Sequence, residues 1–190
     1  GLLLLLSIYI ILNQINPNLL NLNAHLTPIT ITPPAGGGTP GWAVSPELND
    51  PAFTDAGSTW TRLRNAGITR NKSECTAVAQ TNCTSVGGLG EGAVNGLIAL
   101  KNACDQVTPS RCAITVTGGT EWWLHGRGTA HRPGNSVVDL APSPGLNNFL
   151  LGQGVTPTSG MQVTKNFARY TYETTGDNGV STGPHWHVVY

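Results

Sequence analysis

The fold is decided by residues 114–140, which read ITVTGGTEWWLHGRGTAHRPGNSVVDL. The segment opens with alternating β-branched residues and two glycines, a pattern that predicts a strand followed by a turn. It then carries three potential metal-binding side chains, His125, His131 and Asp139. The last six residues of the chain, HWHVVY, hold two more histidines, so four of the five histidines lie in these two stretches. We therefore interpret the two stretches together, as parts of one site.

The end of the chain has the pattern of a β-hairpin. Residues 167–174, FARYTYET, alternate aromatic with polar side chains and predict a strand. The GDNG that follows is turn chemistry, and HWHVVY is the predicted partner strand. Because alternate residues of a strand face the same side, His185 and His187 are expected to point together, with Trp186 on the opposite face.

Two imidazoles and a carboxylate are the ligands of a hydrolytic zinc site that keeps one position open for water. We assign His131, Asp139 and His187 as the zinc ligands. His185, beside the metal, is the candidate general base or oxyanion donor. The assigned residues have ordinary alternatives: the His-x-His pair as a surface ladder, and Asp139 as a turn or cap residue. His125 is expected to be a loop histidine, with a direct metal role as the alternative.

The order T-G-G, H-x-x-G, V-D-L and a late H-W-H resembles the D-alanyl-D-alanine zinc carboxypeptidase group. That group belongs to a wider fold shared with lysostaphin-type peptidases and the Hedgehog signalling domain. The resemblance covers roughly residues 88–190. It implies zinc binding by His131, Asp139 and His187, and a catalytic role for His185. It also implies that the substrate is a peptidoglycan peptide.

The sequence departs from the pattern of that group in three places. The spacing between the first two ligands is one residue longer than usual, which a β-bulge would absorb. An arginine that binds substrate after the first strand is missing from residues 117–121, TGGTE, and Arg127 or Arg132 is the candidate substitute. Pro184 stands where some members carry an acidic base, which leaves His185 as the base.

Three residues are candidates for contacting the substrate: Glu121, Trp123 and Arg132. Glu121 either binds a substrate amine, orients a ligand histidine, or is a solvated loop charge. The indole rings of Trp122 and Trp123 either line a peptide cleft or pack under the loop.

Helices are predicted upstream of the site. Residues 89–104 carry an apolar stripe at helical spacing, and residues 58–68 predict a shorter helix with Ser58 as N-cap and Gly67 as C-cap. A helix packed on a small antiparallel sheet with a zinc site, as in the Hedgehog and D-Ala-D-Ala peptidase fold, makes the predicted fold class α+β.

Four cysteines occur, at Cys75, Cys83, Cys104 and Cys112. They form no C-x-x-C pair, and an even number indicates disulfides in an oxidising compartment. Three connectivities are possible. We favour 75–83 and 104–112 because each closes a short local loop. The alternative is four reduced, buried side chains.

Residues 1–26 begin with GLLLLLSIYIIL and predict part of a transmembrane helix, although a soluble buried helix is the alternative. Residues 27–57 are rich in Pro, Gly and Thr and predict a linker to a domain at 58–190. The chain is therefore expected to be anchored in a membrane of bacterial type, outside the cytoplasm. Charged residues make up 11% of the chain and balance to zero, which argues against a nucleic-acid partner.

These patterns support three hypotheses of function. The first is a zinc peptidase that cleaves peptidoglycan peptides, as a D-Ala-D-Ala carboxypeptidase or a cell-wall endopeptidase. The second is a catalytically inactive, zinc-stabilised binding module, which the missing arginine and the longer spacing favour. The third is a structural subunit of a pilus or filament, with an apolar N-terminal helix followed by a β domain.

Overall fold

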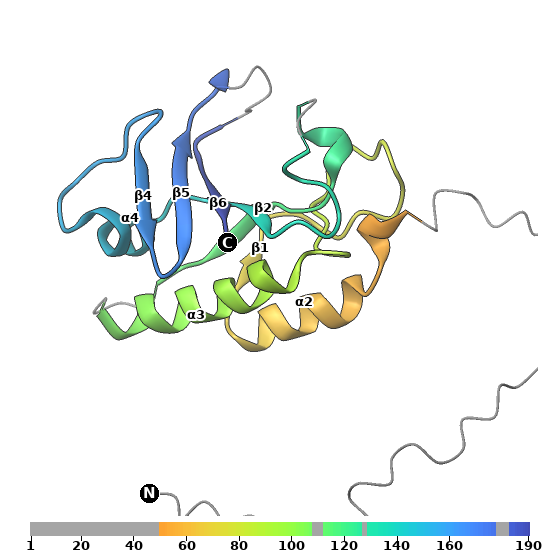
Figure 1. Ribbon diagram of the computed structural model, residues 1–190, viewed down its shortest axis with the longest axis horizontal. Helices are drawn as coiled ribbons and strands as arrows, with labels where there is room; N and C mark the ends of the chain where they lie inside the picture. The colour runs from red at the N-terminus through yellow and green to blue at the C-terminus, as the bar shows by residue number, and fades with distance from the viewer. Residues whose placement is uncertain (1–49, 108–111, 127–128, 178–182) are drawn as a thin grey trace, which may run out of the picture. The chain divides into compact units, whose positions relative to one another are not determined.

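The structure is a computed structural model that describes residues 50–107, 112–126, 129–177 and 183–190 (Figure 1). All of them belong to one compact unit, Ala43–Tyr190. The predicted hydrophobic helix at 1–26 and the linker up to residue 49 lie outside the described residues. Among the residues described, no helix is long and apolar enough to cross a membrane.

Six strands form one mixed sheet that is combined with helices, which confirms the α+β class. In chain order the elements are η2 (Pro51–Phe53), α2 (Ala56–Asn65), β1 (Thr69–Arg70), α3 (Glu91–Val107), β2 (Thr115–Gly118), η3 (Trp122–Leu124), β3 (Val137–Leu140), α4 (Pro144–Leu151), β4 (Gln162–Lys165), β5 (Ala168–Glu173) and β6 (His185–Val189). The strand order across the sheet is β1-β2-β3-β6-β5-β4.

The sequence predicted an antiparallel sheet, but one pair of strands is parallel. Strands β1 and β2 pair in parallel, whereas every other neighbouring pair is antiparallel. The chain leaves β1, runs through α3 and returns in β2, and a crossover of this kind is what a parallel pair requires. In Figure 1, α2 and α3 lie side by side along one side of the sheet, and α4 lies near β4.

Helix α3 supplies much of the core against the sheet. Its predicted apolar stripe is confirmed, since Val94, Leu97 and Leu100 are buried. The helix begins two residues later and ends three residues later than the predicted range 89–104. Strands β2, β3 and β6 meet this helix with buried apolar side chains, Val116, Val138, Leu140, Trp186 and Val188.

Helix α2 begins earlier than predicted. Its N-cap is Asp55 rather than Ser58, because the Ser58 hydroxyl donates to the Asp55 carbonyl instead of accepting from an amide of the first turn. Gly67 follows the helix with a φ of +78°, as expected of a residue that ends a helix in the left-handed region. Ala52 is fully buried, so the last residues of the predicted linker belong to the folded body and the boundary drawn at 58 falls inside α2.

Both favoured disulfides are present. Cys75 is bonded to Cys83, and Cys104 is bonded to Cys112. The first closes a loop beside β1, and the second joins the last turn of α3 to the segment that enters β2. The chain is therefore covalently tied to the main core helix just before it enters β2.

Strand β6 lies in the middle of the sheet between β3 and β5. Its predicted pairing with residues 167–174 is confirmed, and His185 stands opposite Glu173. On its other side, His187 stands opposite Asp139 of β3. The alternative assignment of Asp139 to a turn or cap is therefore wrong, because the residue lies within a strand that the sequence analysis did not predict.

Candidate metal centre

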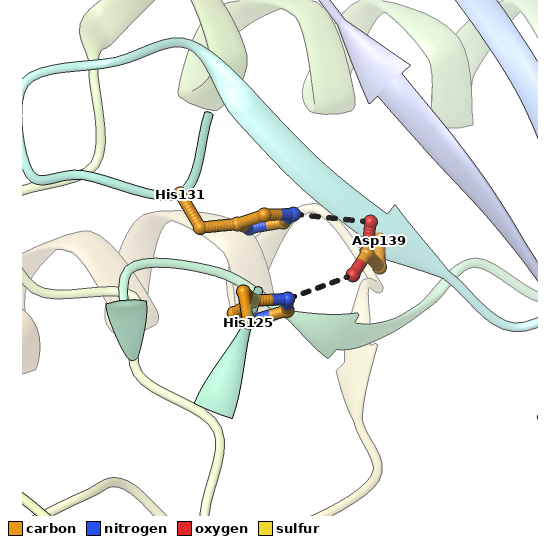
Figure 2. A group of neighbouring side chains, drawn as sticks. All are labelled: His125, His131 and Asp139. Carbon is orange, nitrogen blue, oxygen red and sulfur yellow. Dashed lines mark ion pairs between the residues drawn. The ribbon is translucent and has the colours of Figure 1, made fainter. Parts of the chain in front are cut away.

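Four histidines surround the carboxylate of Asp139, which is 6% exposed. Three of them approach its oxygen Oδ1: His187 Nδ1 at 3.0 Å, His131 Nε2 at 3.4 Å and His185 Nε2 at 3.8 Å. The fourth, His125, places Nδ1 3.6 Å from Oδ2. Figure 2 shows the rings of His125 and His131 directed at the two oxygens of this one carboxylate. Two stretches far apart in sequence thus converge on a single anionic group.

The sheet register explains half of this arrangement. Asp139 and His187 are direct cross-strand neighbours of β3 and β6. The two-residue period of a strand puts His185 on the same face as His187 and turns Trp186 to the other face, where it is completely buried. The predicted orientation of these three β6 residues is confirmed.

Gly118, at the end of β2, makes room for the other half. A β-bulge shifts the β2–β3 register between Val116 and Gly118, which brings Gly118 opposite Asp139. A Cβ at Gly118 would lie 2.6 Å from Asp139 Oδ2 and 2.8 Å from His125 Cε1. Any larger residue here would displace one of these two side chains, so the glycine is a requirement of the site.

His131 is oriented by the main chain. Its Nδ1 lies 2.7 Å from the Gly119 carbonyl oxygen, which only accepts hydrogen bonds, so we assign the proton to Nδ1. The other nitrogen, Nε2, then faces Asp139. Burial works to lower the pKa of His131, but the hydrogen bond and negative charge of Asp139 outweigh burial and raise the pKa above its usual value. Without a metal, a proton on Nε2 balances the carboxylate.

The carboxyl group of Asp139 stays ionised. Burial works to raise its pKa, but hydrogen bonds from His131 and His187, together with the positive charge of the surrounding histidines, hold the pKa well below its usual value. A buried carboxylate in this state needs a cation or several donors beside it. Neutral imidazoles and a metal ion supply this balance as well as protonated histidines do.

Glu121 is not a solvated loop charge, as one alternative held. Its side chain is buried and accepts hydrogen bonds from the amides of Ser85 (2.7 Å) and Gly119 (3.0 Å). Its Oε1 lies 3.5 Å from Nε2 of His125, a buried atom without a hydrogen-bond partner among the described residues. This position fits the alternative in which Glu121 orients a histidine. The His125 ring itself stacks on His131, with centroids 3.6 Å apart and planes within 8°.

Glu173 is a third carboxylate at the site, and the sequence analysis missed it. Its Oε2 lies 3.3 Å from His185 Nε2, while His185 Nδ1 is bonded to the Gly183 carbonyl oxygen at 2.9 Å. The alternation of FARYTYET was a usable signal, because it places Glu173 on the polar face of β5. Only the strand register, however, shows that this face meets His185.

The two remaining predicted contact residues lie at the rim of the loop. Trp123 donates from Nε1 to the Gln80 carbonyl at 2.9 Å, so its indole is bound to the disulfide-closed loop. Arg132 is exposed, and its guanidinium stacks on the ring of Trp122 at 4.2 Å. Arg127, the other candidate to replace the missing arginine, lies outside the described residues.

The donor set fits a metal ion. One donor atom each from His125, His131 and Asp139 lie within 4.8 Å of one another. Nitrogen and carboxylate donors of this kind suit zinc and neighbouring transition metals. Two of the three predicted ligands are in this group, and the third, His187, contacts Asp139 directly. His125, for which a direct metal role was only the alternative, belongs to the group as well.

Comparisons of the chain with protein-family models, with curated proteins and with solved structures found no match. The resemblance to zinc carboxypeptidases therefore stays a prediction, and the site must be interpreted from its own geometry.

Proposed function

We propose that the chain is a zinc-dependent peptidase, with zinc held by His131, Asp139 and His187 and one position left open. The supporting observation is that His131 Nε2 and His187 Nδ1 both face one oxygen of a buried carboxylate. The two rings are inclined at 65° with centroids 5.2 Å apart. Rings at a large angle can direct their in-plane lone pairs at one ion, as ligands of a tetrahedral metal do.

Zinc bound there would polarise a substrate carbonyl and lower the pKa of a water to about 7. The protein's own residues have separate tasks. Asp139 contributes negative charge at neutral pH, and the Gly119 carbonyl keeps Nε2 of His131 directed at the site. We propose that His185 accepts a proton and returns it to the leaving amine.

Glu173 supports that role of His185. Its carboxylate lies 3.3 Å from Nε2, the nitrogen that would exchange the proton. An imidazolium formed there is stabilised by the nearby negative charge. The absence of an acid at Pro184 is thus offset by a carboxylate from the neighbouring strand.

The proposed substrate class is the peptide of peptidoglycan, cleaved at its terminal D-alanine or at a cross-link. This part rests on the resemblance of the His, Asp and His-x-His pattern. Two disulfides fit an oxidising location outside the cytoplasm. Anchoring by residues 1–26 would hold the enzyme beside the cell wall.

The test is turnover by the zinc-loaded full chain of a peptide ending in D-Ala-D-Ala and of a cross-linked cell-wall peptide, followed by mass spectrometry. We expect product from one of them, lost in the zinc-free protein and reduced about 100-fold or more in His185→Ala, since general acid–base groups contribute on that order. Zinc content of His185→Ala, measured in parallel, should be unchanged. Absence of product from both substrates with stoichiometric zinc would reject the peptidase.

One observation favours the second candidate, a zinc-stabilised binding module without activity. His125 brings a fourth protein donor to the same carboxylate, and zinc sites with four protein ligands are structural. In that case zinc would raise the melting temperature of the protein while neither peptide is cleaved.

A further inference from the structure

We propose that His125 is a fourth, displaceable ligand of the metal, which closes the site at rest and gives way when a peptide carbonyl binds. The proposal rests on the zinc site described under the proposed function. A fourth protein ligand would fill the position that a catalytic zinc needs for water or substrate. If His125 dissociates, that position becomes free.

The first support is the way the Asp139 carboxylate is shared. Each of its oxygens faces one of the stacked rings, with His131 Nε2 3.4 Å from Oδ1 and His125 Nδ1 3.6 Å from Oδ2 (Figure 2). Neighbouring donors around a tetrahedral zinc with bonds of about 2.0–2.1 Å lie about 3.3 Å apart. The observed separations are therefore close to those of a loaded site.

The second support is the surroundings of the other nitrogen of His125. Its Nε2 is buried and lies 3.5 Å from Glu121 Oε1. A proton on Nε2 would point toward this carboxylate, so we assign the proton of His125 to Nε2. Nδ1 then presents a lone pair to Asp139. Two acceptors that face each other need a proton or a metal ion between them, and a carboxylate–histidine–metal series is the usual way to orient a ligand imidazole.

Glu121 is fixed strongly enough for that purpose. It is 1% exposed, and the amides of Ser85 and Gly119 donate to its two oxygens. Gly119 also accepts from His131 through its carbonyl. Gly119 therefore contacts both Glu121, which lies beside His125, and His131. Both rings are held toward Asp139.

The third support concerns why His125 is the ligand that leaves. Its ring is stacked on His131 with centroids 3.6 Å apart and planes within 8° of parallel, so a single ion cannot lie in the planes of both rings. His187, inclined at 65° to His131, has no such difficulty. His125 also follows a short 3-10 helix, whereas His187 lies in a strand in the middle of the sheet.

The experiment compares the full chain with His125→Ala and His125→Phe, both loaded with cobalt in place of zinc. His125→Phe keeps a ring stacked on His131 but removes the nitrogen donor, so it is the control for packing. Two quantities are measured: the affinity for cobalt and zinc by competition with a chelator, and the affinity of acetohydroxamate for bound cobalt, followed by its visible spectrum.

We expect opposite changes in the two quantities. Metal affinity should fall about 10- to 100-fold in both variants, while acetohydroxamate should bind at least about 10-fold more tightly because a position is open. A purely structural role would not tighten acetohydroxamate binding. Metal and acetohydroxamate affinities equal to those of wild type would overturn the role of His125 and leave the three-ligand site standing. A wild-type chain that binds neither metal would overturn both proposals.

Discussion

The two faces of strand β6 are one residue apart and have opposite chemistry. Trp186 and Val188 point into the core and are fully buried. Trp186 packs edge-on against Tyr172 and donates to the Asn147 side chain at 2.9 Å, so its apolar and polar parts are both satisfied. His185 and His187 point the other way, toward the carboxylates of Glu173 and Asp139.

This difference shows what folding accomplishes and what it leaves open. On the core face, every contact forms when the sheet and helices pack. On the site face, packing brings four histidines together around Asp139, and the charge balance is completed by protons or by a metal ion. Variants of the two faces should therefore separate stability from metal binding.

The largest effect on stability is expected from the core face. Trp186→Ala removes a completely buried ring and its hydrogen bond to Asn147. We expect the free energy of unfolding to fall by about 3–5 kcal/mol, measured by urea denaturation of the metal-free protein. A loss below about 1 kcal/mol would show that β6 is not central to the core.

The next largest effect is expected from the site face. Asp139→Asn keeps the shape of the side chain but removes the charge shared by the surrounding histidines. Zinc affinity should fall by about 100-fold or more, because the anionic ligand is lost. Glu91→Gln, an exposed carboxylate of α3, is the matched control and should bind zinc as wild type does. Equal zinc affinities for the two variants would show that Asp139 is not a zinc ligand.

The disulfide that joins α3 to the segment before β2 tests whether a loss of stability also weakens zinc binding. Replacing Cys104 and Cys112 by alanine opens a loop with a sequence separation of 8. The chain-entropy account predicts a loss of roughly 2–3 kcal/mol in unfolding free energy. The zinc affinity of the folded variant should change little, because neither cysteine is a proposed zinc ligand. A large loss of zinc affinity at unchanged stability would contradict this separation.

The smallest effect is expected from pH in the metal-free protein. Asp139 has a lowered pKa, so its contribution is present above about pH 4 and is lost as pH falls through its folded value. His131 has a raised pKa, so its contribution is present below about pH 6.5 and is lost as pH rises through its folded value. Unfolding free energy should therefore peak between these limits, with losses on the order of 1–2 kcal/mol on either side. Asp139→Asn should flatten the profile.

With zinc bound, the stability of the protein should rise rather than fall as pH increases above about 6.5. A ligand histidine must be neutral, so zinc affinity should rise as His131 loses its proton. Melting temperatures measured with and without zinc between pH 5 and about 8 test this sign. Equal pH dependence in the two series would contradict a metal on His131.

Much of the fold was accessible from sequence periodicity. The α3 stripe, the alternation of β5 and the β-branched run of β2 each indicated the element that formed. Strand β3 was missed because all four of its side chains are buried, so it shows no alternation. Strand β1 has two residues, too few for any period.

The site was predictable where its residues cluster in sequence and not where they meet only in space. His131, Asp139 and His187 were selected by type and order. Glu121 resembled a loop charge because its partners, Ser85 and Gly119, are main-chain amides that leave no mark in the sequence. Glu173 reaches the site only through the β5–β6 register.

The most direct test of a metal centre around Asp139 is a crystal structure of the zinc-loaded protein with anomalous data collected at the zinc absorption edge. We expect one strong peak at bonding distance from Asp139, His131 and His187, with His125 either bound or turned away by a ligand. A peak elsewhere, or none in a protein soaked with excess zinc, would contradict a metal centre around Asp139.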